Sequence, residues 1–137
     1  MAWPARRYFD GLIRDLGDFL RDVRVTRLEI GSERALIDVE GMWGEHRIIL
    51  SEIHRPDGSS RYAYYILDSE NRLVAGFDNS SDVQAIKMQY DTDWRQHLHE
   101  EIPHRHDGQK NMRLTDKIDA SRFLAWLQTN FPSKTVQ

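Results

Sequence analysis

Hydrophobic residues near the N-terminus recur at steps of three and four, which is the spacing of one face of an α-helix. Aspartate and arginine occupy the opposite face of the same segment. This pattern predicts an amphipathic helix over about residues 5–23. Helical spacing returns near the C-terminus behind Asp119 or Ser121, either of which can cap a helix, and predicts a second helix over about residues 119–131.

Between these two segments the hydrophobic period changes to two, as in β-strands that bury one face. Short alternating runs separated by glycine-containing turns lead into residues 61–67, which are apolar or aromatic on both faces, and then into residues 73–77. We place these last two strands at the centre of the sheet, because a strand covered on both sides is apolar on both. The pattern predicts five or six antiparallel strands in a meander over about residues 24–78.

Residues 79–113 lose both periods and gather Asp, Asn, Ser, His and Gly, which predicts a long irregular connection. A connection of this length inside a compact domain is unusual unless it carries function. The chain has 137 residues, of which 39% are hydrophobic, so it can bury one core but not the cores of two ordinary domains. We therefore expect a single α+β domain over residues 1–137, with both helices packed on the sheet.

Composition excludes several classes of protein. Nineteen Lys and Arg against 22 Asp and Glu give a formal charge of −3, so nucleic acid could be bound only through a local patch. The absence of cysteine excludes disulfides, cysteine-ligated metal centres and thiol nucleophiles. No apolar run approaches the ~20 residues that span a bilayer, so we expect no membrane partner and a cytoplasmic protein.

Four of the six histidines lie within ten residues, as His97, His99, His104 and His106. Pro103 disfavours helix before it, so the segment after it is expected to be extended. In an extended chain residues i and i+2 project to the same side, which directs His104 and His106 toward one site. His97 and His99 rank second, since they could equally lie on a helix surface.

Acid–base catalysis is one use of such a histidine pair. Two imidazoles that titrate near neutral pH can deprotonate a ribose 2′-hydroxyl and protonate the leaving 5′-oxygen. Arg105 or Lys110 would then stabilise the charge on the phosphorus oxygens. Cleavage of RNA by His104 and His106 in this way needs no cofactor.

Metal binding is the second use, and a purely structural role is the third. A His-x-His pair with a third ligand, such as Glu101, can hold zinc or manganese with an open coordination position. Histidines in a loop can also lie in solvent or bond main-chain carbonyls and do nothing more. The spacing alone leaves all three open.

Four further residues are candidates for binding or orienting a substrate. Asp78 and Asn79 follow a central strand, although the same residues are typical of an ordinary turn. Arg61 could contact phosphate. Tyr64 could stack on a base, although a run that is apolar on both faces more often belongs to the core.

The stretch from about residue 61 to 127 resembles the TumE family. The resemblance is carried by three short motifs in the family's order, Arg61-Tyr62-Ala63-Tyr64-Tyr65, Asp78-Asn79 and Pro103-His104-Arg105-His106, and by the helix that follows them. Members of this family are regarded as toxin components of prokaryotic toxin–antitoxin pairs and are usually encoded beside a DNA-binding antitoxin. The resemblance covers about half of the chain.

This resemblance implies a toxin with a cognate DNA-binding antitoxin as its partner. Together with the histidine chemistry, it leads us to expect a small ribonuclease that acts on RNA through His104 and His106. The connection over residues 80–102 is longer than in compact members of the family, and the N-terminal helix is an addition. A non-catalytic module that binds protein or nucleic acid is the alternative.

Overall fold

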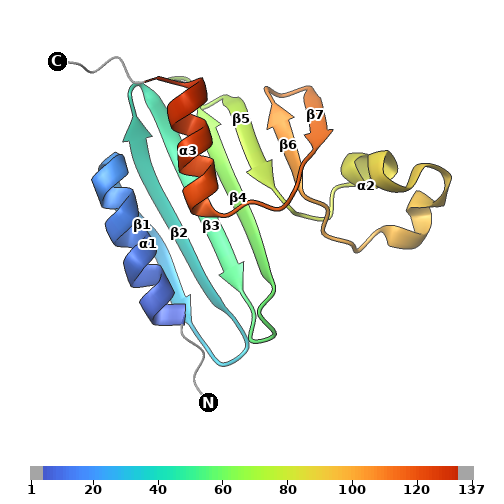
Figure 1. Ribbon diagram of the computed structural model, residues 1–137, viewed down its shortest axis with the longest axis horizontal. Helices are drawn as coiled ribbons and strands as arrows, with labels where there is room; N and C mark the ends of the chain where they lie inside the picture. Colours follow the sequence, from blue (N-terminus) through green and yellow to red (C-terminus); the bar gives the residue numbers. More distant parts are fainter. Residues whose placement is uncertain (1–4, 133–137) are drawn as a thin grey trace.

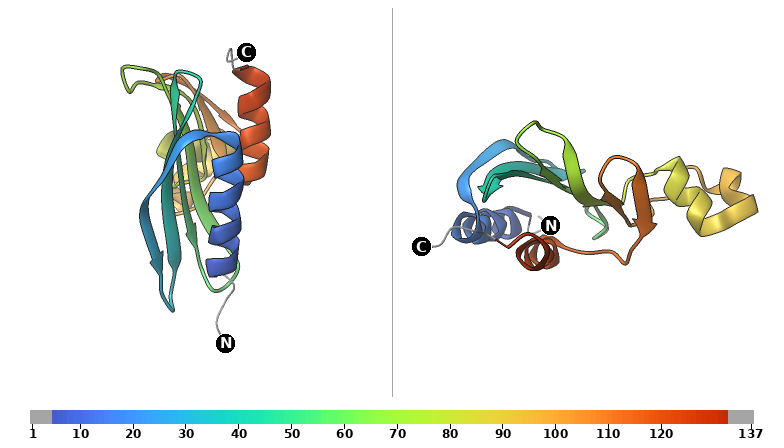
Figure 2. Two further views of the ribbon diagram at one scale, coloured as in Figure 1. Left: turned by 90° about the vertical axis from the view of Figure 1, so that its left-hand side faces the viewer. Right: turned by 90° about the horizontal axis from the view of Figure 1, so that it is seen from above.

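The computed structural model describes residues 5–132 as an α+β fold built on one seven-stranded antiparallel sheet, in which β1 to β7 lie in chain order. Helices α1 and α3 cover one face of the sheet, and α2 lies beyond the β7 edge (Figures 1 and 2). The elements are α1 (Ala5–Phe19), β1 (Arg21–Ile30), β2 (Ala35–Trp43), β3 (His46–His54), β4 (Ser60–Leu67), β5 (Leu73–Asp78), α2 (Val83–Tyr90), the 3₁₀ helix η1 (Asp91–His97), β6 (His104–Asp107), β7 (Asn111–Leu114) and α3 (Ala120–Asn130).

The predicted α+β class and the antiparallel meander are confirmed, and the strand count is higher than predicted. Strands β6 and β7, together with α2 and η1, lie within residues 79–113, where we expected an irregular connection. Both strands have four residues, which is too short to show a period in the sequence. They are held by pairing with the rest of the sheet, since β6 continues the ladder beyond β5.

The N-terminal helix is shorter than predicted. It ends at Phe19 and β1 begins at Arg21, whereas the apolar spacing carried the helix to about residue 23 and began the sheet at about residue 24. Asp22 has a φ of 54°, which an α-helix does not allow. Val23 still packs against the core, but from strand β1. A hydrophobic residue at position 23 is therefore compatible with the helical spacing as well as with the alternation of a strand. None of the helices in residues 5–132 is long and apolar enough to cross a membrane.

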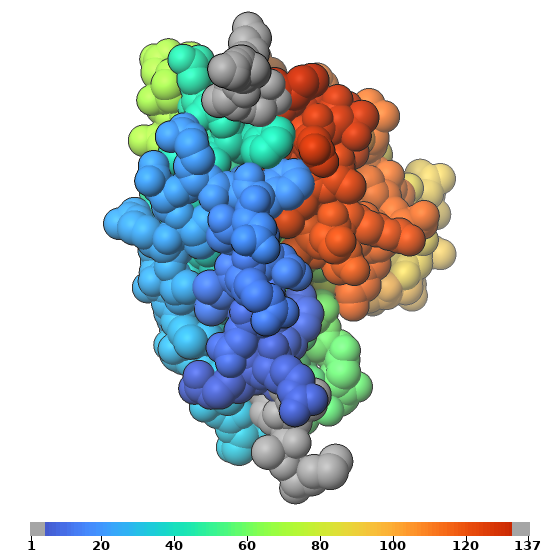
Figure 3. All heavy atoms as spheres, turned by 60° about the vertical axis from the view of Figure 1, so that its left-hand side comes forward, coloured from blue at the N-terminus to red at the C-terminus, as the bar shows by residue number. Residues whose placement is uncertain are grey.

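The C-terminal helix lies where it was predicted. Asp119 is its cap, and the Asp119 carboxylate accepts a hydrogen bond of 2.9 Å from the main-chain N–H of Arg122. Figure 3 shows α3 packed beside α1 over the same side of the molecule.

The main core lies between these two helices and the sheet. Alternate residues of the central strands point toward the helices, as the period of two requires. The largest fully buried members include Phe9, Leu16, Ile37, Ile48, Leu50, Tyr64, Ile66, Phe123 and Leu127. The other set of alternating residues points to the opposite face, which α1 and α3 leave open.

A buried carboxylate joins α1 to the sheet. Glu52 accepts hydrogen bonds from the Tyr8 hydroxyl at 2.8 Å and the Tyr64 hydroxyl at 2.7 Å, and its Oε1 lies 2.7 Å from Nε2 of His54. Burial and the charge of Glu52 raise the pKa of both tyrosines, so both stay protonated and continue to donate. Three partners therefore compensate this charge.

We expect Tyr64→Phe to lower the free energy of unfolding by about 1–3 kcal/mol, because the Glu52 carboxylate then loses a donor that water cannot replace. Tyr64 is 2% exposed, whereas Tyr8 is 41% exposed. Tyr8→Phe should therefore cost less than about 1 kcal/mol, since water can reach the vacated position. Urea unfolding of both variants measures this. Equal losses would contradict the assignment of Tyr64 as the buried donor.

Candidate functional site

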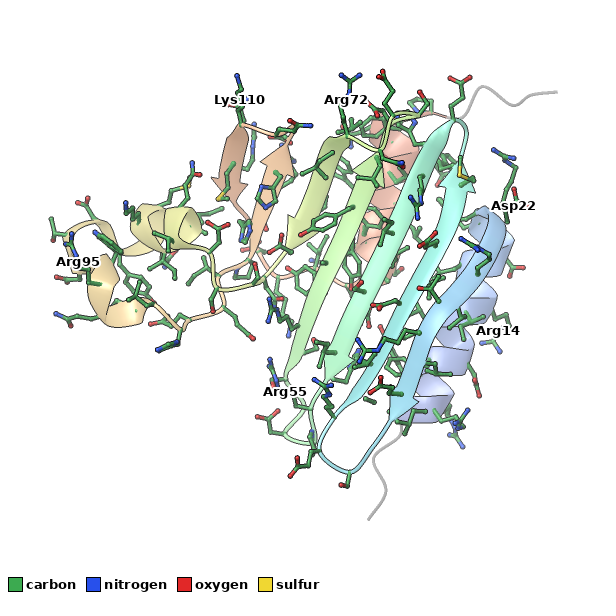
Figure 4. All side chains as sticks on the ribbon, turned by 180° about the vertical axis from the view of Figure 1, so that it is seen from behind. Arg14, Asp22, Arg55, Arg72, Arg95 and Lys110 are labelled. Atoms are coloured by element: carbon green, nitrogen blue, oxygen red, sulfur yellow. The ribbon has the colours of Figure 1, made fainter. Side chains whose placement is uncertain are left out.

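Strands β5 and β6 bring Asp78, His104 and His106 together on the open face of the sheet. Asp78 is paired with His104, and Gly76 with His106, so the three side chains belong to neighbouring rows of one face. The alternate residue Phe77 points the other way and packs on Phe123 of α3. Figure 4 views the sheet from the open side.

Both imidazoles lie against the same carboxylate. Nε2 of His104 is 3.0 Å from Oδ1 of Asp78, and Nε2 of His106 is 3.3 Å from Oδ2. The two rings stand edge to face with centroids 4.9 Å apart. The structure thus places the two histidines on one side of β6 and brings them against Asp78, which the sequence offered as a candidate for binding or orienting a substrate but not as their direct partner.

The two histidines differ in their access to solvent. His104 is completely buried, whereas the His106 side chain is 22% exposed. A direct approach of substrate is therefore open to His106 and closed to His104. This differs from the expectation that both rings of the pair would act on RNA.

His104 has a fixed tautomer. Its Nδ1 lies 2.6 Å from the carbonyl oxygen of Ile102, and because a carbonyl can only accept, Nδ1 carries a proton. Its buried Nε2 has no well-formed hydrogen bond despite the 3.0 Å approach to Asp78. Without a proton, Nε2 would present a lone pair to a carboxylate. A positive charge, either a proton on Nε2 or a metal ion, is needed to make this contact attractive.

Asp78 is the centre of the cluster. The Tyr65 hydroxyl donates to Oδ2 at 2.9 Å, and the hydroxyl and main-chain N–H of Ser80 donate to Oδ1 at 2.7 and 3.0 Å. Burial by itself would raise the pKa of Asp78, but the contacts with His104 and Ser80 outweigh it and hold this pKa well below its ordinary value. Asp78 therefore stays ionised.

The pKa of His104 is shifted in the complementary direction. Burial would lower it, but the contact with Asp78 and the hydrogen bond to the Ile102 carbonyl outweigh burial, and the pKa of His104 is raised. In the absence of metal, the cluster thus favours a charged imidazole beside a charged carboxylate.

Gly76 allows Tyr65 to reach this carboxylate. The two residues are paired across β4 and β5, and a Cβ on residue 76 would lie 2.3 Å from Cδ1 of Tyr65. The tyrosine ring therefore crosses β5 over the glycine, and its hydroxyl meets Asp78 two residues further along. Burial and the charge of Asp78 raise the pKa of Tyr65, which keeps this hydroxyl protonated.

Arg105 and Lys110, the predicted phosphate stabilisers, do not join the cluster. Arg105 lies on the opposite face of β6, where its guanidinium is 5.4 Å from the ring centroid of Trp126 and 2.8 Å from Asp107. Lys110 is exposed in the turn between β6 and β7, at the far end of the hairpin (Figure 4). The period of two along β6 accounts for Arg105, since His104 and His106 occupy the other side.

Asn79 and Tyr64 have structural roles here. The Asn79 side chain accepts from the N–H of Tyr62 at 2.8 Å and donates to the carbonyl of Ser60 at 3.0 Å, which ties the end of β5 to the start of β4. Tyr64 points into the main core and bonds Glu52. Arg61 is exposed on β4 and lies four residues before Tyr65, so both side chains point to the open face. Arg61 thus places a positive charge on that face.

The remaining predicted residues lie in or beside the lobe formed by α2 and η1. His97 stacks on Tyr90 with ring centroids 3.5 Å apart and pairs with Glu100. His99 is exposed. Glu101, expected as a third metal ligand, instead pairs with Arg55 at 2.8 Å.

The lobe closes the site on the β7 side. Ala85 and Ile86 of α2 form a second buried cluster with Ile102, against which Met112 and Leu114 of β7 pack. In the sheet, Met112 is paired with His106 and Leu114 with His104. The hydrophobic contacts of α2 therefore lie in the same rows as the two histidines, and they fix β6 and β7 beside β5.

The same three side chains could hold a metal ion. One possible ligand atom from each of Asp78, His104 and His106 lies within 4.8 Å of the other two. Nε2 of His104 approaches Oδ1 of Asp78 at 3.0 Å and Nε2 of His106 approaches Oδ2 at 3.3 Å, and carboxylate oxygen and imidazole nitrogen are both ligands of zinc. The Ile102 carbonyl holds His104 in the tautomer that leaves Nε2 for a metal.

Sequence reasoning missed Tyr65, Ser80 and Gly76. The alternation within residues 61–67 separates Tyr65 from Tyr64 and places it with Arg61, so this signal was available. The contact of Ser80 with Asp78 is a local turn in which a carboxylate bonds the residue two positions on.

The chain was also compared with family models, curated proteins and solved structures, and no match was found in any of them.

The stability of the metal-free protein should depend on pH in two limbs. Because the pKa of Asp78 is lowered by folding, its contribution is present above its ordinary value of 3.8 and is lost as pH falls through the lowered value. Because the pKa of His104 is raised, its contribution is present below 6.5 and is lost as pH rises through the raised value. Urea unfolding with a chelator should show the largest contribution of the pair between these pH values, and His104→Gln should remove the upper limb.

Gly76→Ala should lower the free energy of unfolding by about 1–3 kcal/mol, because the new methyl group and the Tyr65 ring cannot occupy the same space. In a Tyr65→Ala background the same change should cost much less, since the clash is gone. A double-mutant cycle by urea unfolding measures this coupling. Additive losses would show that Tyr65 does not lie over Gly76.

Proposed function

We propose that the protein is a TumE-like toxin that cleaves RNA at the cluster of Asp78, His104 and His106. The observation that carries the proposal is the convergence of two of the motifs that resemble TumE. Residues 79–102 separate Asp78 of the Asp-Asn motif from Pro103 of the Pro-His-x-His motif, yet Asp78 contacts both histidines. The partial exposure of His106 supports access of a substrate to the cluster.

In this proposal His106 is the general base. Asp78 contacts its Nε2 and orients the ring, which leaves Nδ1 as the nitrogen that would accept the proton of a substrate. His106 takes the proton of the ribose 2′-hydroxyl, the 2′-oxygen bonds the phosphorus, and the bond from phosphorus to the 5′-oxygen breaks. The products are a 2′,3′-cyclic phosphate and a 5′-hydroxyl.

The leaving 5′-oxygen needs a proton, and Tyr65 is the donor that the geometry favours. Its hydroxyl and His106 contact the same oxygen of Asp78, at 2.9 and 3.3 Å. The buried His104 holds Asp78 in place and does not meet RNA. Arg61 is the exposed cation on this face that is suited to bind phosphate.

A second candidate is a metal-dependent nuclease at the same residues. The buried Nε2 of His104, which has no well-formed hydrogen bond, favours it, because a zinc or manganese ion would satisfy this nitrogen together with His106 and Asp78. An ion held by these three residues would lower the pKa of a bound water and so supply the nucleophile near neutral pH. Either chemistry fits a cytoplasmic toxin neutralised by a DNA-binding antitoxin.

Purified protein should cleave a labelled structured RNA, and His106→Ala should reduce the rate by about 10²–10⁴-fold, as expected for loss of a general base. His99→Ala is the matched control, since His99 is exposed in the lobe and lies outside the cluster. The melting temperature of each variant shows that folding is retained. Cleavage is followed by gel electrophoresis in the presence of EDTA.

The chelator separates the candidates. Cleavage that persists in EDTA supports the acid–base mechanism, whereas cleavage lost in EDTA and restored by zinc or manganese supports the metal site. If the wild type cleaves no RNA under either condition and His106→Ala still arrests growth, both nuclease mechanisms are wrong and the chain acts as a binding module.

A further inference from the structure

Strand β1 forms a free edge of the sheet. It has ten residues and pairs only with β2 within residues 5–132. Most of its side chains are exposed, including the apolar residues Val25, Leu28 and Ile30. The opposite edge differs, because β7 has four residues and is packed by α2. A long edge that no described element covers is a template for pairing with another strand.

The turn between β1 and β2 fixes which backbone groups point outward. The N–H of Gly31 donates to the carbonyl of Arg34 at 2.9 Å. Pairs along an antiparallel ladder alternate between hydrogen-bonded and non-hydrogen-bonded. Leu28 and Ile30, which are opposite Ile37 and Ala35, therefore occupy non-hydrogen-bonded positions, and their N–H and C=O groups point away from β2.

The sequence around Leu28 is complementary to itself. If two copies of β1 pair antiparallel about a two-fold axis at Leu28, the outward groups of Leu28 meet those of Leu28 in the second copy. Arg27 then lies opposite Glu29 of the second copy, and Glu29 opposite its Arg27. These two side chains are about half exposed and already pair within one chain at 2.8 Å. The two copies would therefore form an alternating group of four charges.

We propose that this protein forms a two-fold dimer through β1, with a second copy of the chain as the occupant of the edge. The dimer joins two seven-stranded sheets into one continuous sheet and leaves each cluster of Asp78, His104 and His106 four strands away. It does not rest on the proposed function. Shifts in the β1–β2 register between Arg21 and Arg24 and between Val25 and Arg27 confine regular pairing to the second half of the strand. We therefore expect a reversible dimer.

Cysteine cross-linking tests this register, because the chain has no cysteine of its own. In the proposed dimer the two copies of residue 28 face each other with Cα atoms about 5.5 Å apart, within the range of a disulfide. Leu28→Cys should give a covalent dimer on mild oxidation. Ile30→Cys is the matched control, since both side chains are 38% exposed but the two copies of residue 30 lie more than about 13 Å apart.

Sedimentation equilibrium of the unmodified chain should show a dimer fraction that rises with concentration. Leu28→Lys should lower this fraction, because it places two like charges at the axis, while the melting temperature stays near that of the wild type. A chain that is monomeric at all concentrations overturns the proposal. Equal cross-linking at residues 28 and 30 overturns the register. A dimer that Leu28→Lys does not weaken uses another surface, and that result also overturns the proposal.

Discussion

The buried carboxylate of Asp78 and the charge that must compensate it dominate the open face of this protein. A carboxylate removed from water is costly unless donors or cations surround it. Ser80, Tyr65, His104 and His106 supply these groups from four separate positions in the chain. The end of β5 brings Ser80 to the carboxylate, the position of β6 brings the two histidines, and the space over Gly76 admits Tyr65. Each feature therefore supplies a donor or a positive charge to the same two oxygens.

The second buried carboxylate, Glu52, shows what a fully compensated site looks like. It lies on the covered face and has two tyrosine hydroxyls, from α1 and β4, and His54 of its own strand as partners. The Asp78 cluster differs in one respect. It contains a buried imidazole nitrogen, Nε2 of His104, whose hydrogen bonding is incomplete. Incomplete satisfaction of a buried polar atom requires an explanation, and a proton or ligand that comes and goes supplies one.

Most of the fold could be predicted, because long elements repeat their period several times. The two terminal helices and the strands up to β5 were accessible in this way, whereas β6 and β7 were not, since four residues contain only two repeats. The shared side of His104 and His106 followed from Pro103 and the alternation of an extended chain. The contact of both rings with Asp78, itself a candidate from the sequence, did not follow, because it depends on the register of β5 against β6. Glu101 is nearer in sequence and was the obvious choice, but the fold directs it to Arg55.

The lobe of α2 and η1 explains how this register arises. It lies between Asp78 and the histidines in the chain, so any error in its return would move both imidazoles away from the carboxylate. Ile86 and Ile102 pack together in a small core of their own, and Met112 of β7 packs on them. The lobe therefore ends where β6 must begin. Because these contacts fix its return, it can be longer than a simple turn without displacing the histidines from Asp78. The apolar residues that anchor the lobe, rather than its many polar ones, place the chemistry beside β5.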